Sequence, residues 1–287
     1  MKINTISPDD SKYLQMLNDI AKKPKKLHYA GILPKERRPS VAIVGTRKPT
    51  PYGREVTQRF AFELASRGVV IVSGLALGVD AIAHKAALEA GGTTIAVLGN
   101  GLPTIYPAAH ANLAKEIISS RGAIISEYDE YEKARPHYFL ERNRLVSGLA
   151  DIVLITEAAA RSGTLNTAGH ALEQGRDIFV IPGNITSPMS LGCNQLLKQG
   201  AMPATSPEDI LEILNLTDTL NDAPRTLPRG STPLETAVIT AIAGGIQDGD
   251  AIQAELEVSA TELSAALTML ELSSAIKALG ANRWTLR

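Results

Sequence analysis

The sequence predicts an α/β protein in which a doubly wound, mostly parallel sheet precedes a small winged-helix domain. Short apolar runs of four or five residues recur between residues 41 and 181, and amphipathic stretches of helical length separate them. Parallel strands covered by helices on both faces are apolar throughout, as these runs are. Beyond residue 232, two closely spaced helical stretches precede two short strand-like ones, which is the order of a winged helix.

The elements of the sheet follow one another regularly along the chain. Strands are expected at residues 41–44, 69–72, 94–98, 123–126, 152–156 and 178–181. Helices are expected at about 52–67, up to residue 90, from 108 to about 120, and near 165–174. Because strands joined through a helix run parallel, their carboxyl ends should meet at one edge of the sheet.

The composition divides the chain into four parts. Residues 1–39 form a short N-terminal extension with a helix expected over 9–21, and residues 40–219 form the main α/β domain. Residues 220–232 contain Pro224, Pro228 and Gly230 and are typical of a linker. The last part, 233–287, is the winged helix, with helices at 233–243, 249–256 and 261–273 and strands at 275–276 and 283–286.

The totals exclude several classes of protein. The single cysteine, Cys193, rules out a disulfide framework and a multi-cysteine zinc site. The sequence shows no signal peptide and no run of about 18 apolar residues, so we expect a cytoplasmic protein without a membrane span.

The charges are distributed unevenly along the chain. The net charge is −1, yet residues 1–67 hold 14 Lys and Arg against 6 Asp and Glu. Residues 68–204 hold 10 against 12, and residues 205–287 hold 5 against 12. This asymmetry predicts a basic face at one end of the chain and an acidic module at the other. The cluster Lys22–Lys26, with Lys35, Arg37 and Arg38, could rim a phosphate-binding surface.

Small residues follow the predicted strands, at the edge where open α/β sheets bind ligands. Backbone N–H groups there can approach an anion, and the helix that follows favours negative charge. Arg47 and Lys48 lie in the first of these loops. The sequence therefore favours an anion-binding crevice formed by Gly45, Ser73-Gly74, Gly99, Ser126 and Pro182-Gly183.

The sequence gives little support for a nucleotide-binding or hydrolytic enzyme. The first loop places bulky and proline residues where a dinucleotide fingerprint needs glycines, and no Walker A sequence is present. Ser73, Asp80 and His84 contain the residue types of a hydrolytic set, but no strained nucleophile turn accompanies them. We expect instead that Asp80 stabilises the first turn of its helix and bonds His84, four residues on.

The stretch Phe139-Leu-Glu-Arg-Asn-Arg144 brings one aromatic ring and two guanidinium groups together. An aromatic face can stack on a base, and a guanidinium grips phosphate through two hydrogen bonds. The alternative is an ordinary surface helix turn, with the ring in the core and the arginines in solvent.

These stretches together resemble the DNA-processing protein DprA (Smf) family over about residues 41 to 201. The matching pieces are Val44-Gly-Thr-Arg47, Tyr52-Gly53, Ser73-Gly-Leu-Ala76, Gly78, Asp80, His84, Gly92, Gly99-Asn-Gly101, Tyr106-Pro107, Ser126-Glu127, Phe139, Arg142-Asn-Arg144, Glu157-Ala158, Ser162-Gly-Thr-Leu165, Thr167-Ala168, Pro182-Gly183, Gly192-Cys-Asn194 and Gly200-Ala201. Their order and spacing are far more specific than any single motif.

The resemblance implies an extended Rossmann-like domain, without catalysis or a cofactor, that binds single-stranded DNA in a basic pocket. It also implies a homodimer that delivers the strand to the RecA recombinase in natural transformation. By motif, Arg47 contacts phosphate and Phe139 stacks on a base. The candidate DNA-binding residues are Arg47, Lys48, Gly74, Arg135, His137, Phe139, Arg142, Asn143, Arg144, Ser162, Gly163 and Thr164.

The roles of Arg142 and Arg144 stay open at this point. Either arginine contacts phosphate, or it braces the pocket wall through Glu127 or Glu157.

The sequence departs from the family pattern at two places. The family often carries a helical domain before the sheet, which here is absent or reduced to the segment around Tyr13–Gly31. Leu140 follows Phe139 where the family commonly has proline, and Arg135 and His137 supply the basic character before the ring.

Two other functions compete with DNA binding. The lysine-decarboxylase-like phosphoribohydrolases carry P-G-G-x-G-T-x-x-E in related cores, and Thr167 stands where that motif needs its catalytic glutamate. Without the carboxylate, hydrolysis loses its general acid/base unless Glu157 or Glu173 replaces it in another geometry. A nucleotide-sensing module that uses the same glycine loops is the third possibility.

The expected recognition helix of the winged helix, residues 259–272, contains Glu262 and Glu271 and no Lys or Arg. Phosphate contacts dominate DNA affinity, so an acidic helix reads duplex DNA poorly. We therefore predict that this module contacts protein or regulates the main domain.

Overall fold

The computed structural model describes residues 1–216, 230–273, 275–280 and 282–286. The chain divides into two compact units, Met1–Thr219 and Leu220–Arg287, and each is described by itself. Most of the expected linker, residues 220–229, lies outside the described residues. Within the described part of the chain, no helix is both long and apolar enough to cross a membrane.

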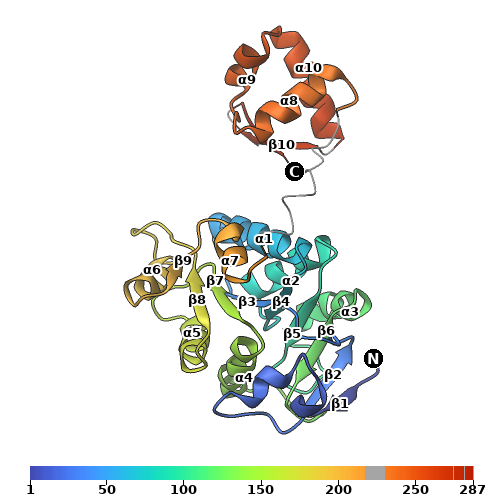
Figure 1. The fold of residues 1–287 in the computed structure, drawn as a ribbon, viewed down its shortest axis with the longest axis vertical. Helices are drawn as coiled ribbons and strands as arrows, with labels where there is room; N and C mark the ends of the chain where they lie inside the picture. Colours follow the sequence, from blue (N-terminus) through green and yellow to red (C-terminus); the bar gives the residue numbers. More distant parts are fainter. Residues whose placement is uncertain (217–229, 274, 281, 287) are drawn as a thin grey trace. The chain divides into compact units, whose positions relative to one another are not determined.

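The first unit is built on one sheet whose order, in the described residues, is β1-β2-β6-β5-β4-β3-β7-β8-β9 (Figure 1). From β6 to β9 all neighbours are parallel. The chain order reverses between β3 and β7, which is the switch point of a doubly wound sheet. The parallel strands are β3 (Ser40–Val44), β4 (Val70–Ser73), β5 (Thr94–Val97), β6 (Ala123–Ser126), β7 (Ile152–Ile155), β8 (Asp177–Val180) and β9 (Met202–Pro203).

The predicted fold class is confirmed, and the six expected strands lie within one residue of the observed ones. Alternate residues of β3 explain why both faces are apolar. Val41 and Ile43 pack in one core with Phe60, whereas Ala42 and Val44 pack in a second core with Leu145.

Helices cover both faces of this sheet. The predictions located α1, α2, α3 and α5, and did not include α4, α6 or α7. The helices are α1 (Pro51–Ser66), α2 (Val79–Glu89), α3 (Ala111–Ser119), α4 (Pro136–Gly148), α5 (Thr164–Glu173), α6 (Leu191–Lys198) and α7 (Pro207–Ile213). The short turn η3 (Ala108–His110) precedes α3.

The N-terminal segment differs from its prediction. The helix expected over residues 9–21 is wrong: two 3-10 turns, η1 (Pro8–Asp10) and η2 (Gln15–Asn18), occupy that part of the chain. Ser7 accepts from the Asp9 backbone N–H at 3.4 Å, and Asn18 donates to the Asp9 side chain at 2.8 Å. Such local bonds compete with an α-helix. The segment between Tyr13 and Gly31, suggested as a reduced helical domain, holds the turn η2 and the strand β2 instead.

Two antiparallel strands also extend the sheet. Strand β1 (Asn4–Ile6) pairs with β2 (Leu27–Gly31), and β2 pairs with β6. The first 39 residues, expected as a separate extension, therefore contribute to the same sheet as the main domain.

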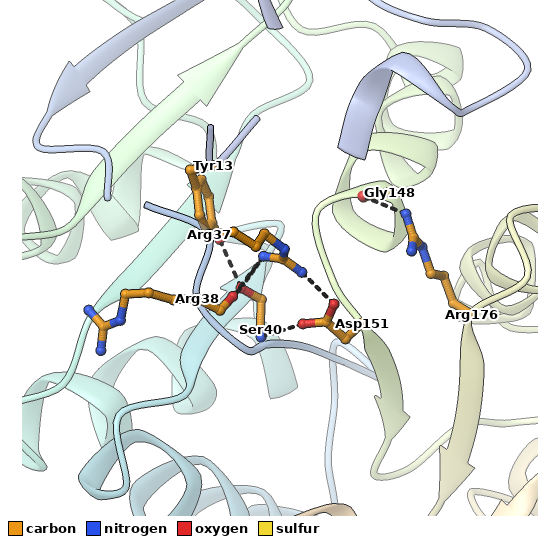
Figure 2. A network of polar contacts seen from close by, with 7 residues as sticks. All are labelled: Tyr13, Arg37, Arg38, Ser40, Gly148, Asp151 and Arg176. Atoms are coloured by element: carbon orange, nitrogen blue, oxygen red, sulfur yellow. Dashed lines mark hydrogen bonds and ion pairs between the residues drawn. The ribbon is translucent and has the colours of Figure 1, made fainter. Parts of the chain in front are cut away.

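Arg37 and Arg38 lie at the amino ends of the strands, where Figure 2 shows a network of polar contacts. Arg37 pairs with the Asp151 carboxylate at 2.5 Å, and that carboxylate accepts from the Ser40 backbone N–H at 2.8 Å. Arg38 donates to the Gly68 carbonyl at 2.7 Å. The suggestion that these two arginines rim a phosphate-binding surface is therefore wrong, because both are bonded to protein at the amino ends of the strands.

The second unit is the expected winged helix. Its helices are α8 (Pro233–Ala243), α9 (Gly249–Leu256) and α10 (Ala260–Leu272), followed by the antiparallel strands β10 (Ile276–Gly280) and β11 (Arg283–Leu286). Helix α10 begins with a capping box in which Ser259 and Glu262 bond each other's backbone N–H groups. The helices and the hairpin enclose a small apolar core that includes Ile239, Leu267 and Ile276.

Candidate functional site

Helix α4 presents two opposite flanks to two different hollows of the molecule. At 100° per residue, Phe139 and Arg142 lie on one flank, whereas Leu140 and Arg144 lie on the other. Pro136 opens the helix, and Arg135 stands before it without capping it through its side chain. The sequence stretch that we singled out is thus one helix that serves two environments.

The first flank of α4 closes a small pocket at the carboxyl ends of β3, β4 and β5. Its volume is about 60 Å³. The structure brings together here four predicted site residues from three separate segments of the sequence, Arg47, Gly74, Phe139 and Arg142. The lining residues are Arg47, Gly74, Ala76, Leu77, Tyr106, Pro107, Phe139 and Arg142.

Two aromatic rings and a cation form the pocket's outer wall. The ring centroids of Phe139 and Tyr106 are 5.3 Å apart, with planes inclined by 32°. The guanidinium carbon of the exposed Arg47 lies 6.0 Å from the Phe139 centroid, within cation–π range. Phe139 is half-buried, whereas Tyr106 is 49 % exposed, so Tyr106 offers the larger free surface.

Arg142 is a bracing residue in this structure. It is 4 % exposed and donates through Nη1 to the Gly74 carbonyl at 2.6 Å and to the Val97 carbonyl. These bonds tie together the carboxyl ends of β4 and β5. A Cβ on Gly74 would lie 2.3 Å from Nη1, so the glycine leaves room for the guanidinium.

A carboxylate accompanies this buried cation. Asp80 accepts from the Gly74 and Ala76 backbone N–H groups at 3.0 and 3.2 Å. Burial raises the pKa of the Asp80 carboxyl, and the charge of Arg142 opposes that rise. Burial likewise lowers the pKa of Arg142, and Asp80 opposes that change. The two charges therefore stabilise one another beneath the pocket.

Arg144 also braces the fold, on the other flank of α4. Its guanidinium forms a bidentate pair with Glu127 at 2.7 and 2.6 Å and is 6 % exposed. Of the two carboxylates considered in the sequence, Glu127 is the partner, and it follows β6. Arg144 is not among the residues that line the pocket of Phe139.

The remaining candidates lie outside that pocket. Asn143 donates to the Asn166 side-chain oxygen of α5 at 3.2 Å. Ser162 and Thr164 bond each other at 2.9 Å beside Gly163, in the loop that follows β7. Lys48 is exposed, next to Arg47.

Arg135 and His137 lie on the surface at the start of α4. Arg135 lies over the Tyr138 ring at 5.5 Å and pairs with Glu132 at 3.5 Å. The His137 ring meets the edge of the Tyr138 ring, with the centroids 4.5 Å apart. Both side chains are exposed, but the charge of Arg135 is partly neutralised by Glu132.

The space beside the glycines at the strand ends is occupied by neighbouring protein atoms. A Cβ on Gly99 would come 2.9 Å from Phe139, one on Gly45 2.7 Å from Val79, and one on Gly183 2.2 Å from Ser190. These glycines permit close packing of loops and of the Phe139 ring.

The hydrolytic set does not form. Ser73 donates to the Ile43 carbonyl at 2.7 Å, and His84 bonds Thr94 through Nδ1 at 2.7 Å. The predicted bond from Asp80 to His84 is wrong, because Asp80 accepts from backbone N–H groups instead. Burial lowers the pKa of His84 to about 3, so the ring is neutral and inert.

The carboxylates considered as substitutes for a catalytic glutamate have other partners. Glu157 is buried and accepts from the Thr50 backbone N–H and hydroxyl at 2.8 and 2.6 Å. It therefore fixes the start of α1. Glu173 lies at the surface 3.4 Å from His170. In the described parts of the chain, no three His, Cys, Asp or Glu residues gather as a metal site would require.

Sequence reasoning gave no role to Tyr106 or Leu77, although both line the pocket and both are exposed. Tyr106 was noted only as one of the residues that match the family. An aromatic residue and a proline between a strand end and a helix were the available signal, but the contact with Phe139 depends on how two distant segments pack.

Models of two protein families match the chain. The family described as DNA recombination-mediator protein A matches residues 4–215, and the DprA winged helix domain matches residues 222–282. The chain belongs to the DprA (Smf) family.

Named relatives and solved structures agree with that assignment. Protein Smf of Escherichia coli is 51 % identical over 174 residues, which are 61 % of this chain and 46 % of Smf. DNA processing protein DprA of Streptococcus pneumoniae is 40 % identical over 210 residues, 73 % of this chain and 74 % of the relative. The chain thus spans about half the length of E. coli Smf.

Two solved structures share the fold. The X-ray structure of DprA from S. pneumoniae has a TM-score of 0.66 at 37 % identity and covers 74 % of each chain. A Helicobacter pylori DprA structure, described as giving insight into its single-stranded DNA binding mode, has a TM-score of 0.66 at 35 % identity. That match covers 75 % of this chain and 96 % of the other.

Proposed function

We propose that this protein binds single-stranded DNA, without catalysis, at the pocket formed by Arg47, Tyr106 and Phe139. The arrangement of these three side chains carries the proposal. Aromatic faces beside an unpaired cation suit a strand whose bases stack and whose phosphates need positive charge. The described single-stranded DNA binding of the H. pylori relative supports the same function for this fold.

Each pocket residue has a distinct role in this proposal. Arg47 contacts a backbone phosphate, because its guanidinium is exposed and has no ion pair among the described residues. Phe139 and Tyr106 offer stacking surfaces to one base each. Arg142 and Arg144 hold the helix that presents Phe139 and do not contact DNA.

The other candidates supply the surroundings. Lys48 and Arg135 provide positive charge near the path of the strand, His137 offers a ring and hydrogen-bonding nitrogens there, and Gly74 leaves room for the Arg142 guanidinium beneath the pocket. The four remaining candidates lie outside the pocket and contact other parts of the protein. We propose a secondary role in DNA binding for Asn143, Ser162, Gly163 and Thr164.

We further propose that the protein acts as a homodimer in the cytoplasm and helps to load RecA on the bound strand, in natural transformation and recombination. The name of the matching family, a recombination mediator, supports this. A mediator must hold the strand while a recombinase takes it over, so a pocket that contacts the strand at few points suits the task.

Binding of oligothymidine across a salt series tests the DNA site. Arg47→Ala should weaken binding about tenfold and lower the salt slope by about 1, because one phosphate contact is lost. Phe139→Ala and Tyr106→Ala should each weaken binding at least about fivefold with the slope unchanged. Lys115→Ala, an exposed cation on α3, is the matched control and should bind as wild type.

Absence of binding by the wild type at low salt would reject the proposal. Equal effects of Arg47→Ala and Lys115→Ala would show that the strand is held by general charge rather than by this pocket.

A further inference from the structure

A second, larger groove lies on the other flank of α4. Its volume is about 290 Å³, close to the lower limit of about 300 Å³ for small-molecule sites. Helix α4 packs against α5 on one side and against the turn η2 on the other, as Figure 1 shows near the N-terminal turns. Residues of α4, of α5 and of the segment 20–22, which follows η2, line the groove, and none of them lines the pocket of Phe139.

The floor of the groove is apolar. Ile20, Ala21 and Leu140 line it, and Leu140 is 47 % exposed. Leu140 directly follows Phe139 but points to the other flank, as the helical period requires. A half-exposed apolar floor of this kind accepts a flat ring face.

Hydrogen-bonding groups surround this floor. The carboxylates of Glu141 and Glu173 line the groove together with Asn166 and His170. The exposed Lys22, from the basic N-terminal cluster, also lines it. Arg144 is neutralised by Glu127 at 2.6 Å, so the two carboxylates outweigh Lys22. This groove therefore repels a phosphate and favours a neutral ring that carries hydrogen-bond donors.

The first turn of α4 lies between the two hollows. Arg135 is exposed there, so a strand that rounds this turn meets a positive charge on its way. Because one helix forms a wall of both hollows, their separation is on the order of one helix diameter, about 10 Å. A strand that leaves Phe139 needs few nucleotides to reach Leu140.

We propose that this groove is a second nucleobase subsite for the same single strand, and the inference rests on the proposed function. A base lies on Leu140, with its edge toward Glu141 and Glu173, and its phosphate stays outside the groove. Carboxylates accept from exocyclic amino groups, as they do in reading cytosine. The subsite therefore selects bases with an amino group over thymine, whereas stacking on Phe139 and Tyr106 tolerates any base.

Length and base dependence of binding test this subsite. The probes are oligothymidine and oligodeoxycytidine, each in a short form that fills the Phe139 pocket alone and in a longer form. In the wild type, lengthening should strengthen oligodeoxycytidine binding more than oligothymidine binding. Leu140→Asp should weaken binding of long oligodeoxycytidine at least about fivefold and leave the short probes unchanged. Glu173→Gln should reduce the preference for cytosine.

Leu172→Asp is the matched control, since Leu172 is an exposed leucine on α5 outside the groove lining. It should bind every probe as wild type. The subsite is refuted if Leu140→Asp matches Leu172→Asp, or if it weakens short and long probes equally, which would mean that it disturbs Phe139. Failure of the wild type to bind even the short probes rejects the proposed function itself.

Discussion

The two ends of one sheet use arginine in opposite ways. At the amino ends, Arg37 is bonded to Asp151 (Figure 2), and Arg38 donates to the Gly68 carbonyl. At the carboxyl ends, Arg47 extends over Phe139 and stays exposed. All three belong to residues 1–67, the basic stretch of the sequence. Net charge along a chain therefore does not locate a binding face, because a cation bonded to protein is not available to a ligand.

Substitution of Arg142 should have the largest effect on stability. It tests whether, at the carboxyl ends of the strands, Arg142 braces the fold while Arg47 binds DNA. Arg142→Ala removes a buried cation, and it leaves the Gly74 carbonyl without this donor and Asp80 without its opposing charge. The free energy of unfolding should fall by about 3 kcal/mol. Urea denaturation measures it, and Arg142→Lys should restore little, because one ammonium cannot reproduce the guanidinium geometry.

A stable Arg142→Ala protein that loses only DNA affinity would contradict this division. It would show that the buried arginine acts on the ligand directly.

Arg37→Ala should come next and tests the amino end. The Asp151 carboxylate loses its 2.5 Å partner while the Ser40 N–H still bonds it, so stability should fall by about 2 kcal/mol. Affinity for oligothymidine should not change. Arg47→Ala is the counterpart: its stability should stay within about 0.5 kcal/mol of wild type while its affinity drops. The comparison fails if Arg37→Ala weakens DNA binding at equal folded fraction.

His84 should make the stability of the first unit depend on pH. Its pKa in the folded state is lowered to about 3, whereas the unfolded side chain has a pKa of about 6.5. The unfolded chain therefore binds a proton that the folded chain refuses, and stability is lost as the pH falls below about 6.5. Between pH 6.5 and 5 the loss should be on the order of 2 kcal/mol.

Asp80 acts in the opposite direction, since its raised pKa favours protonation in the folded state. A variant of His84 separates the pH dependence caused by the histidine from that caused by Asp80. His84→Asn keeps a donor for Thr94, and its denaturation midpoint should depend less on pH than that of the wild type. Parallel pH profiles of the two proteins would count against the buried neutral ring.

Removal of residues 225–287 should have the smallest effect on DNA binding. Helix α10 carries Glu262 and Glu271 and no Lys or Arg, and phosphate contacts dominate affinity. The remaining unit contains the whole pocket and should bind oligothymidine as the intact chain does, in the same titration. Loss of binding would overturn our proposal that the winged helix contacts protein or regulates the main domain.

Local pattern was sufficient for much of the fold. The strands β3 to β8 are short apolar runs, and such runs are stable inside a covered parallel sheet. Their apolar pattern and the turn residues at their ends therefore predicted them. Helices α8 and α9 have the bounds that the sequence predicted, because Thr232 and Asp248 cap their first turns locally. The motif around Arg47 and Phe139 likewise pointed to one ligand face before any contact was known.

Contacts between distant segments decided the rest. Strand β2 exists because it pairs with β6, from which nearly a hundred residues separate it, and no local pattern announces such a partner. Helical spacing separates Phe139 from Arg144, but only tertiary packing supplies Glu127 to one flank and the Gly74 carbonyl to the other. The sequence by itself determined which residue types gather near the site. Packing decided which arginine is free, because a guanidinium binds whatever acceptor the fold brings within reach.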